Sequence, residues 1–539
     1  MQTTSPIAAA LLLAAACASA QQAPAVQEAP LRAHLAFLAD DLLEGRGTGQ
    51  RGGELAVRYL ETQAAALGLQ PLANGQYRQP VTFQGTRLLP GSSIRFSAGP
   101  ATLAPRLGQD VLIGTASGRP ELVLEAPLLF VGYGVSAPEE RWDDYKDADV
   151  RGKLLLMLVN DPPPTADEPQ RFAGQAYTYY GRWTYKFEQA ARRGAAGALL
   201  IHTDASAAYG WHVPATSFAL ERFHARGAGN QLEGWLSEDY ARLLLQEAGW
   251  SLDALRAAAE RRDFRPLALN IGARAELHSH VRQLEQFNVV GIVPGSDPRL
   301  QHQALVYSAH WDHLGRADDP AGGAPRIFNG AIDNASGSAA LLAMASAAVR
   351  RPARRAQVFL WTAAEEVGMH GAAAYVAQPA FPLKDTLADL NLDSMNFAGR
   401  TRDIGVAGAE RSTLYASAAK VARQMGLTLA PAVPDLSGAY FRADHVQFAR
   451  AGVPAFNVGA AVFSGDGHFA FVQAQEAAAA QIAAFKGDYH TPRDTYHAAW
   501  DLAGMLQQAQ FTLNLGYALA NGRAMPRWRA GEPFGQVAR

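Results

Sequence analysis

The chain has 539 residues, of which 48% are hydrophobic and 18% are charged, and its formal net charge is -2. A chain of this length exceeds one ordinary hydrophobic core, so we expect two or three domains. The nearly balanced charge gives no indication of a nucleic-acid partner or of an anionic membrane surface. The single cysteine, Cys17, lies near the N-terminus, which leaves the rest of the chain without a disulfide or a thiol nucleophile.

The first twenty residues are typical of an export signal. An uninterrupted apolar run, 7–16, precedes the small residues 18–20, which fit a signal-peptidase cleavage site. We therefore predict a signal peptide over 1–20 and an exported protein, periplasmic or secreted by a bacterium. The bulky Leu13 lies one position too early for the usual lipoprotein pattern, which disfavours a lipid anchor on Cys17. The apolar run is too short to span a bilayer, and no other segment is long enough.

Residues 21–110 begin with a polar tether and continue with a helical pattern. Leucines recur at three- and four-residue steps from Leu31 to Leu42, and 54–67 has the pattern of a second helix. The glycine-rich segment 44–53 resembles a phosphate loop only superficially, because it lacks the Gly-Lys-Ser/Thr ending that grips phosphate. We interpret 21–110 as an N-terminal helical segment that packs on the C-terminal domain.

Residues 111–266 differ in texture from their neighbours. Strand-like apolar runs at 121–135 and 152–161 are separated by polar turns, and 186–204 indicates a helix, a glycine turn and a buried strand. No clustered set of metal ligands occurs there, so we predict a separate, β-rich inserted module. Four aspartates between 143 and 149 lack the spacing of an EF-hand, and we interpret them as a solvated acidic loop.

Residues 267–539 alternate strands and helices. Such alternation predicts an α/β domain with a mostly parallel, mixed central sheet and helices on both faces. In open sheets of this kind, ligands bind beyond the carboxyl ends of the strands. This half of the chain is therefore where we expect the chemistry.

Five residues of metal-ligand type occur in this half, in the motifs SAHWDHLG, NGAIDNASG, WTAAEEVGMHG, LNLDSMN and YHTPRDT. They are His310, Asp333, Glu366, Asp393 and His490, and Glu365 precedes Glu366 directly. Several carboxylates close together repel one another and resist ionisation, and two divalent cations would remove that repulsion. Imidazole and carboxylate ligands suit zinc. The sequence therefore predicts a metal centre at the strand ends.

This order of motifs resembles the M28 family of co-catalytic zinc peptidases, the bacterial aminopeptidase group. The resemblance covers nearly everything after the leader, and 111–266 is similar to the protease-associated (PA) domain that larger members carry as an insert. It implies a zinc-peptidase phosphorylase/hydrolase-like fold for the catalytic domain at 267–539. It also implies two zinc ions and the hydrolysis of N-terminal residues from peptide substrates.

The resemblance assigns a role to each ligand. Asp333 would bridge the two zinc ions with its two oxygens. His310 and Asp393 would complete one site, and Glu366 and His490 would complete the other.

Two further carboxylates would serve the reaction. Glu365 would act as the general base toward a metal-activated water. Asp312 lies two residues beyond His310, and on an extended backbone its carboxylate would reach that imidazole and fix its tautomer. The resemblance also implies a cis peptide bond between Asp333 and Asn334.

Other polar residues near these motifs are interpreted as structural. The segment 437–459 resembles the family segment that borders the substrate cleft; we expect Asp444 and His445 to support its wall, and Tyr440 to be a packed aromatic rather than an oxyanion donor. We give the same structural interpretation to His302, His313 and His497. Asp494 is expected to cap the turn after Pro492.

Several functions compete with aminopeptidase. A carboxypeptidase or dipeptidase of the same family differs only in cleft residues outside the metal shell. A single-zinc glutaminyl-cyclase-like acyltransferase and a non-catalytic receptor share the fold, but the complete second ligand set disfavours both. No feature of the sequence indicates an oligomeric state.

Overall fold

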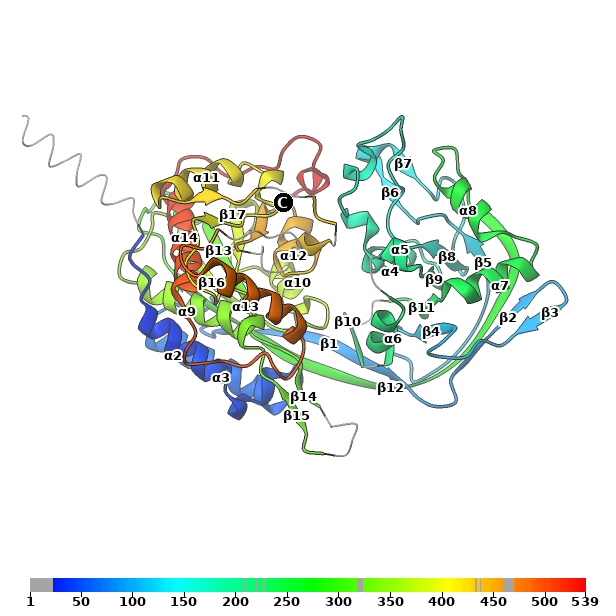
Figure 1. Cartoon of the computed structure of the whole chain (residues 1–539), viewed down its shortest axis with the longest axis horizontal. Helices are drawn as coiled ribbons and strands as arrows, with labels where there is room; N and C mark the ends of the chain where they lie inside the picture. Colours follow the sequence, from blue (N-terminus) through cyan, green and yellow to red (C-terminus); the bar gives the residue numbers. More distant parts are fainter. Residues whose placement is uncertain are drawn as a thin grey trace, which may run out of the picture. The chain divides into compact units, whose positions relative to one another are not determined.

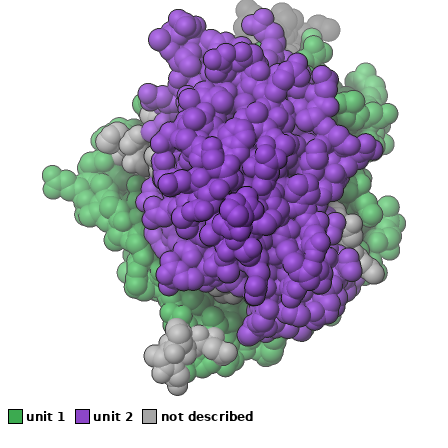
Figure 2. Space-filling model, turned by 90° about the vertical axis from the view of Figure 1, so that its right-hand side faces the viewer, with its two compact units in different colours: residues 1–81, 286–433, 442–539 green, residues 82–285, 434–441 purple. Residues whose placement is uncertain are grey.

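The computed structural model describes residues 23–207, 210–219, 221–225, 229–317, 323–431, 434–436, 438–459 and 470–539. The predicted signal peptide, with Cys17, lies outside the described residues. The chain divides into two compact units, coloured separately in Figure 2. Unit 1 comprises 1–81, 286–433 and 442–539, and unit 2 comprises 82–285 and 434–441. Within the described ranges, no helix is long and apolar enough to cross a membrane.

Unit 1 is built on a mixed, mostly parallel sheet (Figure 1). Its parallel strands, in spatial order, are β20 (Ala455–Asn457), β17 (Thr386–Asn391), β13 (Ala304–His310) and β16 (Ala356–Thr362). The C-terminal end of β12 (Leu267–Val293) pairs antiparallel with β16. Every residue of β13, β16 and β17 is buried, which agrees with their mostly apolar sequences.

Helices cover both faces of this sheet. On one face the Trp361 indole donates to the carbonyl of Ser338 in α9 (Ser336–Ala348), and α14 (Ala503–Asn521) packs on β13 and β17. On the other face Leu360 belongs to a core with Tyr375 of α10 (His370–Ala377) and Phe448 of α12 (His445–Arg450). Trp361 and Leu360 are neighbours in β16, so their side chains point to opposite faces. The predicted α/β class with two helical layers is confirmed.

The N-terminal helices belong to unit 1. The leucine pattern forms α2 (Glu28–Leu38), whose three buried leucines, Leu31, Leu35 and Leu38, are inaccessible to solvent, and α2 packs on α9. A 3-10 helix, η1 (Asp41–Arg46), leads into α3 (Arg51–Ala66). Beyond Ala66 the chain forms strands, namely β1 (Arg78–Leu88), β2 (Ser93–Ala98) and β3 (Ala101–Leu103). The helical segment predicted for 21–110 is therefore helical only in its first half.

Unit 2 contains a sheet of its own. The parallel strands are β5 (Glu121–Phe130), β8 (Leu154–Leu158), β9 (Gly197–Ile201) and β11 (Leu232–Leu236), and β4 (Val111–Gly114) is antiparallel at one end. The helices of this unit include α4 (Trp183–Arg192), α7 (Glu238–Glu247) and α8 (Leu252–Ala259). The predicted insert at 111–266 lies within this larger unit, and its assignment as a PA domain stays a prediction.

One residue of the predicted acidic loop in unit 2 is not solvated. The carboxylate of Asp144 is buried and accepts the backbone N–H of Val135 at 2.9 Å and the Trp142 indole N–H at 2.7 Å. Asp147, by contrast, has a side chain that is 98% exposed. The expectation of a solvated loop is therefore wrong for Asp144, which holds the turn together.

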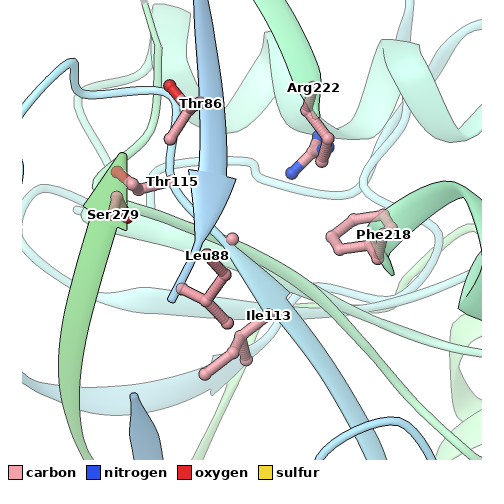
Figure 3. A pocket seen from close by; sticks show the side chains of 8 residues that line it. Thr86, Leu88, Ile113, Thr115, Phe218, Arg222 and Ser279 are labelled. Carbon is pink, nitrogen blue, oxygen red and sulfur yellow. The ribbon is translucent and has the colours of Figure 1, made fainter. Parts of the chain in front are cut away.

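A small cavity lies in unit 2 (Figure 3). It is lined by Thr86 and Leu88 of β1, Ile113 of β4, Phe218 of α6 (His212–Ala219) and Arg222 of β10 (Arg222–Ala225). Its volume of about 10 Å³ is close to that of one water molecule. None of its lining residues belongs to the predicted metal centre.

Candidate metal centre

Four of the predicted site residues lie at one edge of the sheet of unit 1. His310 is the last residue of β13, Glu365 and Glu366 follow the end of β16, and Asp393 follows the end of β17. Because these three strands are parallel and adjacent, their carboxyl ends meet at the same edge. The sheet topology therefore gathers residues that are far apart in the sequence.

Two further residues complete the group from outside the sheet. Asp333 lies in the buried turn Ala331–Ala335, directly before α9, and His490 follows α13 (Gln475–Asp488). The peptide bond between Asp333 and Asn334 is cis, as the family resemblance implies.

Asp333 lies between two imidazoles. One carboxylate oxygen, Oδ1, is 3.2 Å from His310 Nε2, and the other, Oδ2, is 3.0 Å from His490 Nε2. His310 Nε2 is also 3.5 Å from Asp393 Oδ1, and His490 Nε2 is 3.1 Å from Glu366 Oε2. The five side chains thus form two groups that share one carboxylate, which is the arrangement expected of a bridging ligand.

The residues present fit zinc. In each group the candidate ligand atoms lie within 4.8 Å of one another, and all are imidazole nitrogens or carboxylate oxygens. His310 is 1% exposed, and its Nε2 makes no well-aligned hydrogen bond to a described residue although two carboxylates are near. A buried nitrogen that faces carboxylates without pairing with one is suited to coordinate a cation between them.

Comparison with known proteins agrees with this geometry. Residues 288–513, which include all five predicted ligands, match the sequence profile of peptidase family M28. This segment belongs to peptidase family M28.

Individual relatives extend the comparison. The probable leucine aminopeptidase of Arthroderma otae is 28% identical over 255 residues, which are 46% of this chain and 61% of that relative. An aminopeptidase from Aneurinibacillus sp. strain AM-1 has a similar structure, with a TM-score of 0.50 and 18% identity over 93% of this chain and 95% of that chain. A zinc aminopeptidase from Bacillus subtilis matches with a TM-score of 0.43 and 17% identity over 92% and 95% of the two chains. At 18% identity, the similarity to the Aneurinibacillus aminopeptidase shows that the two chains share a fold.

The carboxylates of the metal centre, which are those of Asp333, Glu366 and Asp393, favour protonated imidazoles when no cation is bound. Burial lowers the pKa of His490, but Glu366 and Asp333 raise it by a larger amount, so that the pKa is about 11. Burial also lowers the pKa of His310, which Asp393 and Asp333 raise well above its ordinary value. At neutral pH both imidazoles therefore carry a proton that a metal ion has to displace.

We expect zinc binding to release protons, because only a neutral imidazole can bind a metal ion. The imidazole pKa values are raised, so the competing protons are lost only as the pH rises. The apparent zinc affinity should therefore increase from pH 6 to pH 8, by about tenfold per pH unit for each proton released. Calorimetric titration in buffers of different ionisation enthalpy counts the protons, and an affinity independent of pH would contradict this charge distribution.

Glu365 stands beside the ligands without belonging to either candidate group of described residues. Burial raises the pKa of its carboxyl well above the ordinary range; His310 lowers it, and Glu366 and Asp444 raise it. Its backbone N–H donates to Asp312 Oδ1 at 3.1 Å. Glu365 can thus hold a proton at the edge of the metal centre, and Asp312 fixes its backbone.

Contrary to the prediction, the Asp312 carboxylate does not hold the His310 imidazole. That carboxylate is 3.9 Å from His310 Nδ1, whereas the backbone carbonyl of Asp312 accepts from Nδ1 at 3.0 Å. A carbonyl oxygen only accepts, so Nδ1 carries the proton and Nε2 faces the carboxylates. The prediction assumed extended backbone beyond His310, but β13 ends at that residue. The Asp312 carboxylate binds the Glu365 N–H and the Thr48 hydroxyl instead.

His313 is a residue of the centre that the sequence analysis interpreted as structural. Its side chain is buried, and Nδ1 is 2.5 Å from Glu366 Oε1, whereas His490 is near the other oxygen of that carboxylate, Oε2. His313 also joins the candidate group of Asp333, Glu366 and His490. Its position directly after Asp312 in the HWDH motif was the available signal, but a single histidine gives no sign of its partner.

Asp494 also has a larger role than predicted. Instead of capping the turn after Pro492, its carboxylate accepts the backbone N–H groups of Ile332 at 2.9 Å and Asp333 at 3.1 Å. Burial raises the pKa of Asp494 to about 6. Asp494 therefore fixes the backbone of the bridging residue.

Tyr440 is a packed aromatic residue, as expected, and its ring meets that of Phe441 edge to face. Tyr440 is buried in unit 2, where its backbone N–H donates to Asp435 Oδ2 at 3.0 Å. In unit 1, the ring of Tyr489 stacks on His490 with centroids 3.8 Å apart. Tyr489 is 40% exposed, and loss of water around its hydroxyl, together with the nearby Asp333, raises its pKa well above the ordinary value. Tyr489 is thus a protonated hydroxyl beside the carboxylates.

The remaining residues singled out in the sequence lie outside both candidate ligand groups. Asp444 is buried and accepts a hydrogen bond from the Thr362 hydroxyl, and His445 is buried at the start of α12. His302 and His497 are exposed. These positions agree with the structural interpretation of all four.

Proposed function

We propose that the chain is an exported, zinc-dependent aminopeptidase that removes N-terminal residues from peptides. The observation that carries the proposal is the shared carboxylate of Asp333, which faces one ligand group with each oxygen. The M28 membership of 288–513 and the similarity to a probable leucine aminopeptidase support the activity. The apolar run and small-residue site within 1–20 support export.

The ligand groups define where two zinc ions would be held. His310, Asp333 and Asp393 would hold one ion, and Asp333, Glu366 and His490 would hold the other. When bound, such a pair acidifies a water molecule and polarises the carbonyl of the scissile bond.

The protein's own groups would carry the proton. Glu365 would take it from the attacking water onto its carboxylate and later give it to the leaving amine. Its raised pKa suits a group that has to retain a proton between these two steps. The Tyr489 hydroxyl, beside His490, is a donor available to the oxyanion that develops on the substrate carbonyl.

The charge of the centre also bears on which end of a peptide it would bind. Asp393 and Glu365 are both close enough to affect the pKa of His310, so at least two carboxylates meet at this edge. A positively charged α-amino group is the complementary end of a peptide, whereas a C-terminal carboxylate would meet like charge. The free amine is therefore proposed to be the recognised feature.

A substrate screen tests the proposal. The purified chain should hydrolyse aminoacyl anilides and unblocked peptides from the N-terminus, leave N-acetylated versions intact, and lose activity in a zinc chelator until zinc is restored. Loss of C-terminal residues from N-acetylated peptides would identify a carboxypeptidase instead. Cyclisation of an N-terminal glutamine without peptide hydrolysis would identify an acyltransferase.

A further inference from the structure

Arg46 is a buried cation at the end of η1, in the glycine-rich segment that leads to α3. Its side chain belongs to a residue that is 1% exposed, and its backbone has a φ of 52°. Burial lowers the pKa of Arg46 to about 10, so the guanidinium remains charged at neutral pH. A buried charge is unfavourable unless its hydrogen-bonding groups are satisfied, so the partners of this side chain indicate its purpose.

Among the described residues, the guanidinium donates only to backbone carbonyls. Nε donates to Trp311 at 2.7 Å, and Nη2 donates to Gly330 at 2.9 Å. Nη1 donates to Leu38, the last residue of α2, at 2.5 Å and to Asn329 at 2.6 Å. Trp311 separates His310 from Asp312, and Gly330 is three residues before Asp333. One planar side chain therefore connects two of the segments that supply ligands to the metal centre.

The backbone of the same glycine-rich segment lies directly against these two segments. The N–H of His313 donates to the carbonyl of Arg46 at 3.4 Å, and Thr48 donates its hydroxyl to Asp312 at 3.2 Å. Gly45 permits this approach, because a Cβ there would lie 2.3 Å from the carbonyl oxygen of Phe328. The glycines that resemble a phosphate loop in the sequence thus bring this segment close to protein backbone.

Asp494 complements Arg46 on the segment before α9. The Arg46 guanidinium donates to the carbonyls of Asn329 and Gly330, whereas the Asp494 carboxylate accepts from the N–H groups of Ile332 and Asp333. A cation on the carbonyls and an anion on the N–H groups restrain both ends of this short segment. The backbone that carries the bridging carboxylate is therefore held by hydrogen bonds to both its carbonyl and its N–H groups.

We propose that Arg46 is a positioning residue for the metal centre, whose guanidinium fixes the segment carrying His310 and His313 relative to the segment carrying Asp333. The proposal rests on the proposed function, because it assumes that these side chains bind zinc. It predicts a defect in metal affinity that exceeds any general loss of stability. Partners that orient metal ligands typically contribute about 10- to 100-fold in affinity.

The experiment compares two buried arginines of unit 1 in the full chain. Arg355 is 3% exposed and donates to the backbone carbonyls of Ala520 and Gly522 and to the Gln303 side chain. None of these partners, in the part of the chain that the structure describes, belongs to a metal-ligand segment. Arg46→Lys and Arg355→Lys keep the charge and lose the planar fork that reaches several acceptors. Because a buried lysine can unfold the chain, the neutral Arg46→Gln and Arg355→Gln variants are measured beside them. Zinc affinity by chelator competition, the visible spectrum of the cobalt-loaded chain and metal-free urea stability are the readouts.

We expect both pairs of variants to lose urea stability, and only the Arg46 variants to bind zinc about 10- to 100-fold more weakly with an altered cobalt spectrum. Unchanged zinc affinity in a folded Arg46 variant, or an equal loss in the matching Arg355 variant, would overturn the proposal. So would failure of both Arg46 variants to fold while the Arg355 variants fold, because Arg46 would then be a general stability element. If the unaltered chain bound no zinc, the proposed function would fail instead.

Discussion

Replacing Glu365 by glutamine should lower kcat by about 10²- to 10⁴-fold while both zinc ions stay bound. The amide has nearly the shape of the carboxylate but cannot take a proton from water. Glu365 lies outside both candidate ligand groups, so its charge is not required to hold a cation. The measurement is kcat on an unblocked peptide together with the zinc content of the same sample.

The neighbouring Glu366→Gln variant is the matched control. Glu366 is 3.1 Å from His490 and belongs to a candidate ligand group, so its replacement should reduce the zinc content as well as the activity. The two adjacent substitutions should therefore differ in metal binding. A Glu365→Gln enzyme with nearly normal kcat would show that another group, or solvent, carries the proton.

The ligand set could be predicted because it depends on the periodicity of the chain. Buried parallel strands are recognisable as apolar runs, and their carboxyl ends meet at one edge of a sheet. His310, Glu366 and Asp393 each occur at or just after such an end, and the structure brings them together. Local pattern placed these residues at strand ends, and the order of the motifs, through its resemblance to the M28 family, indicated that they are ligands.

The surrounding contacts could not be predicted, because they join residues that are distant in the sequence. His313 pairs with Glu366 across 53 positions, and Asp494 binds the backbone of Asp333 across 161. Asp494 was predicted to cap a turn because the residues adjacent to it in the sequence indicate only its local role. The role of Arg46 was not predicted, because the glycines around it resemble those of a phosphate loop.

The prediction for Asp312 was wrong for a different reason, which is the local geometry of the backbone. The expected contact with His310 required extended backbone, in which alternate side chains face the same way. The strand ends at His310, and the backbone carbonyl of Asp312 takes the place that its carboxylate was expected to occupy. Because β13 ends at His310 and not at Asp312, the imidazole bonds to the backbone of Asp312 and not to its side chain.

Replacing Asp333 by asparagine should remove both zinc ions, whereas Asp393→Asn should remove only one. Asp333 offers one oxygen to each imidazole, so both groups lose a charged ligand when it is neutralised. Asp393 faces His310 alone, at 3.5 Å. Because ligand loss is more severe than loss of an outer partner, we expect each affected site to weaken by at least about 100-fold.

The zinc content of these three chains, measured by mass spectrometry after equilibration at one free zinc concentration, tests the paired centre most directly. We predict about two zinc ions in the unaltered chain, about one in Asp393→Asn and almost none in Asp333→Asn. A single zinc ion in the unaltered chain, or one retained after Asp333→Asn, would contradict a centre built on a shared carboxylate.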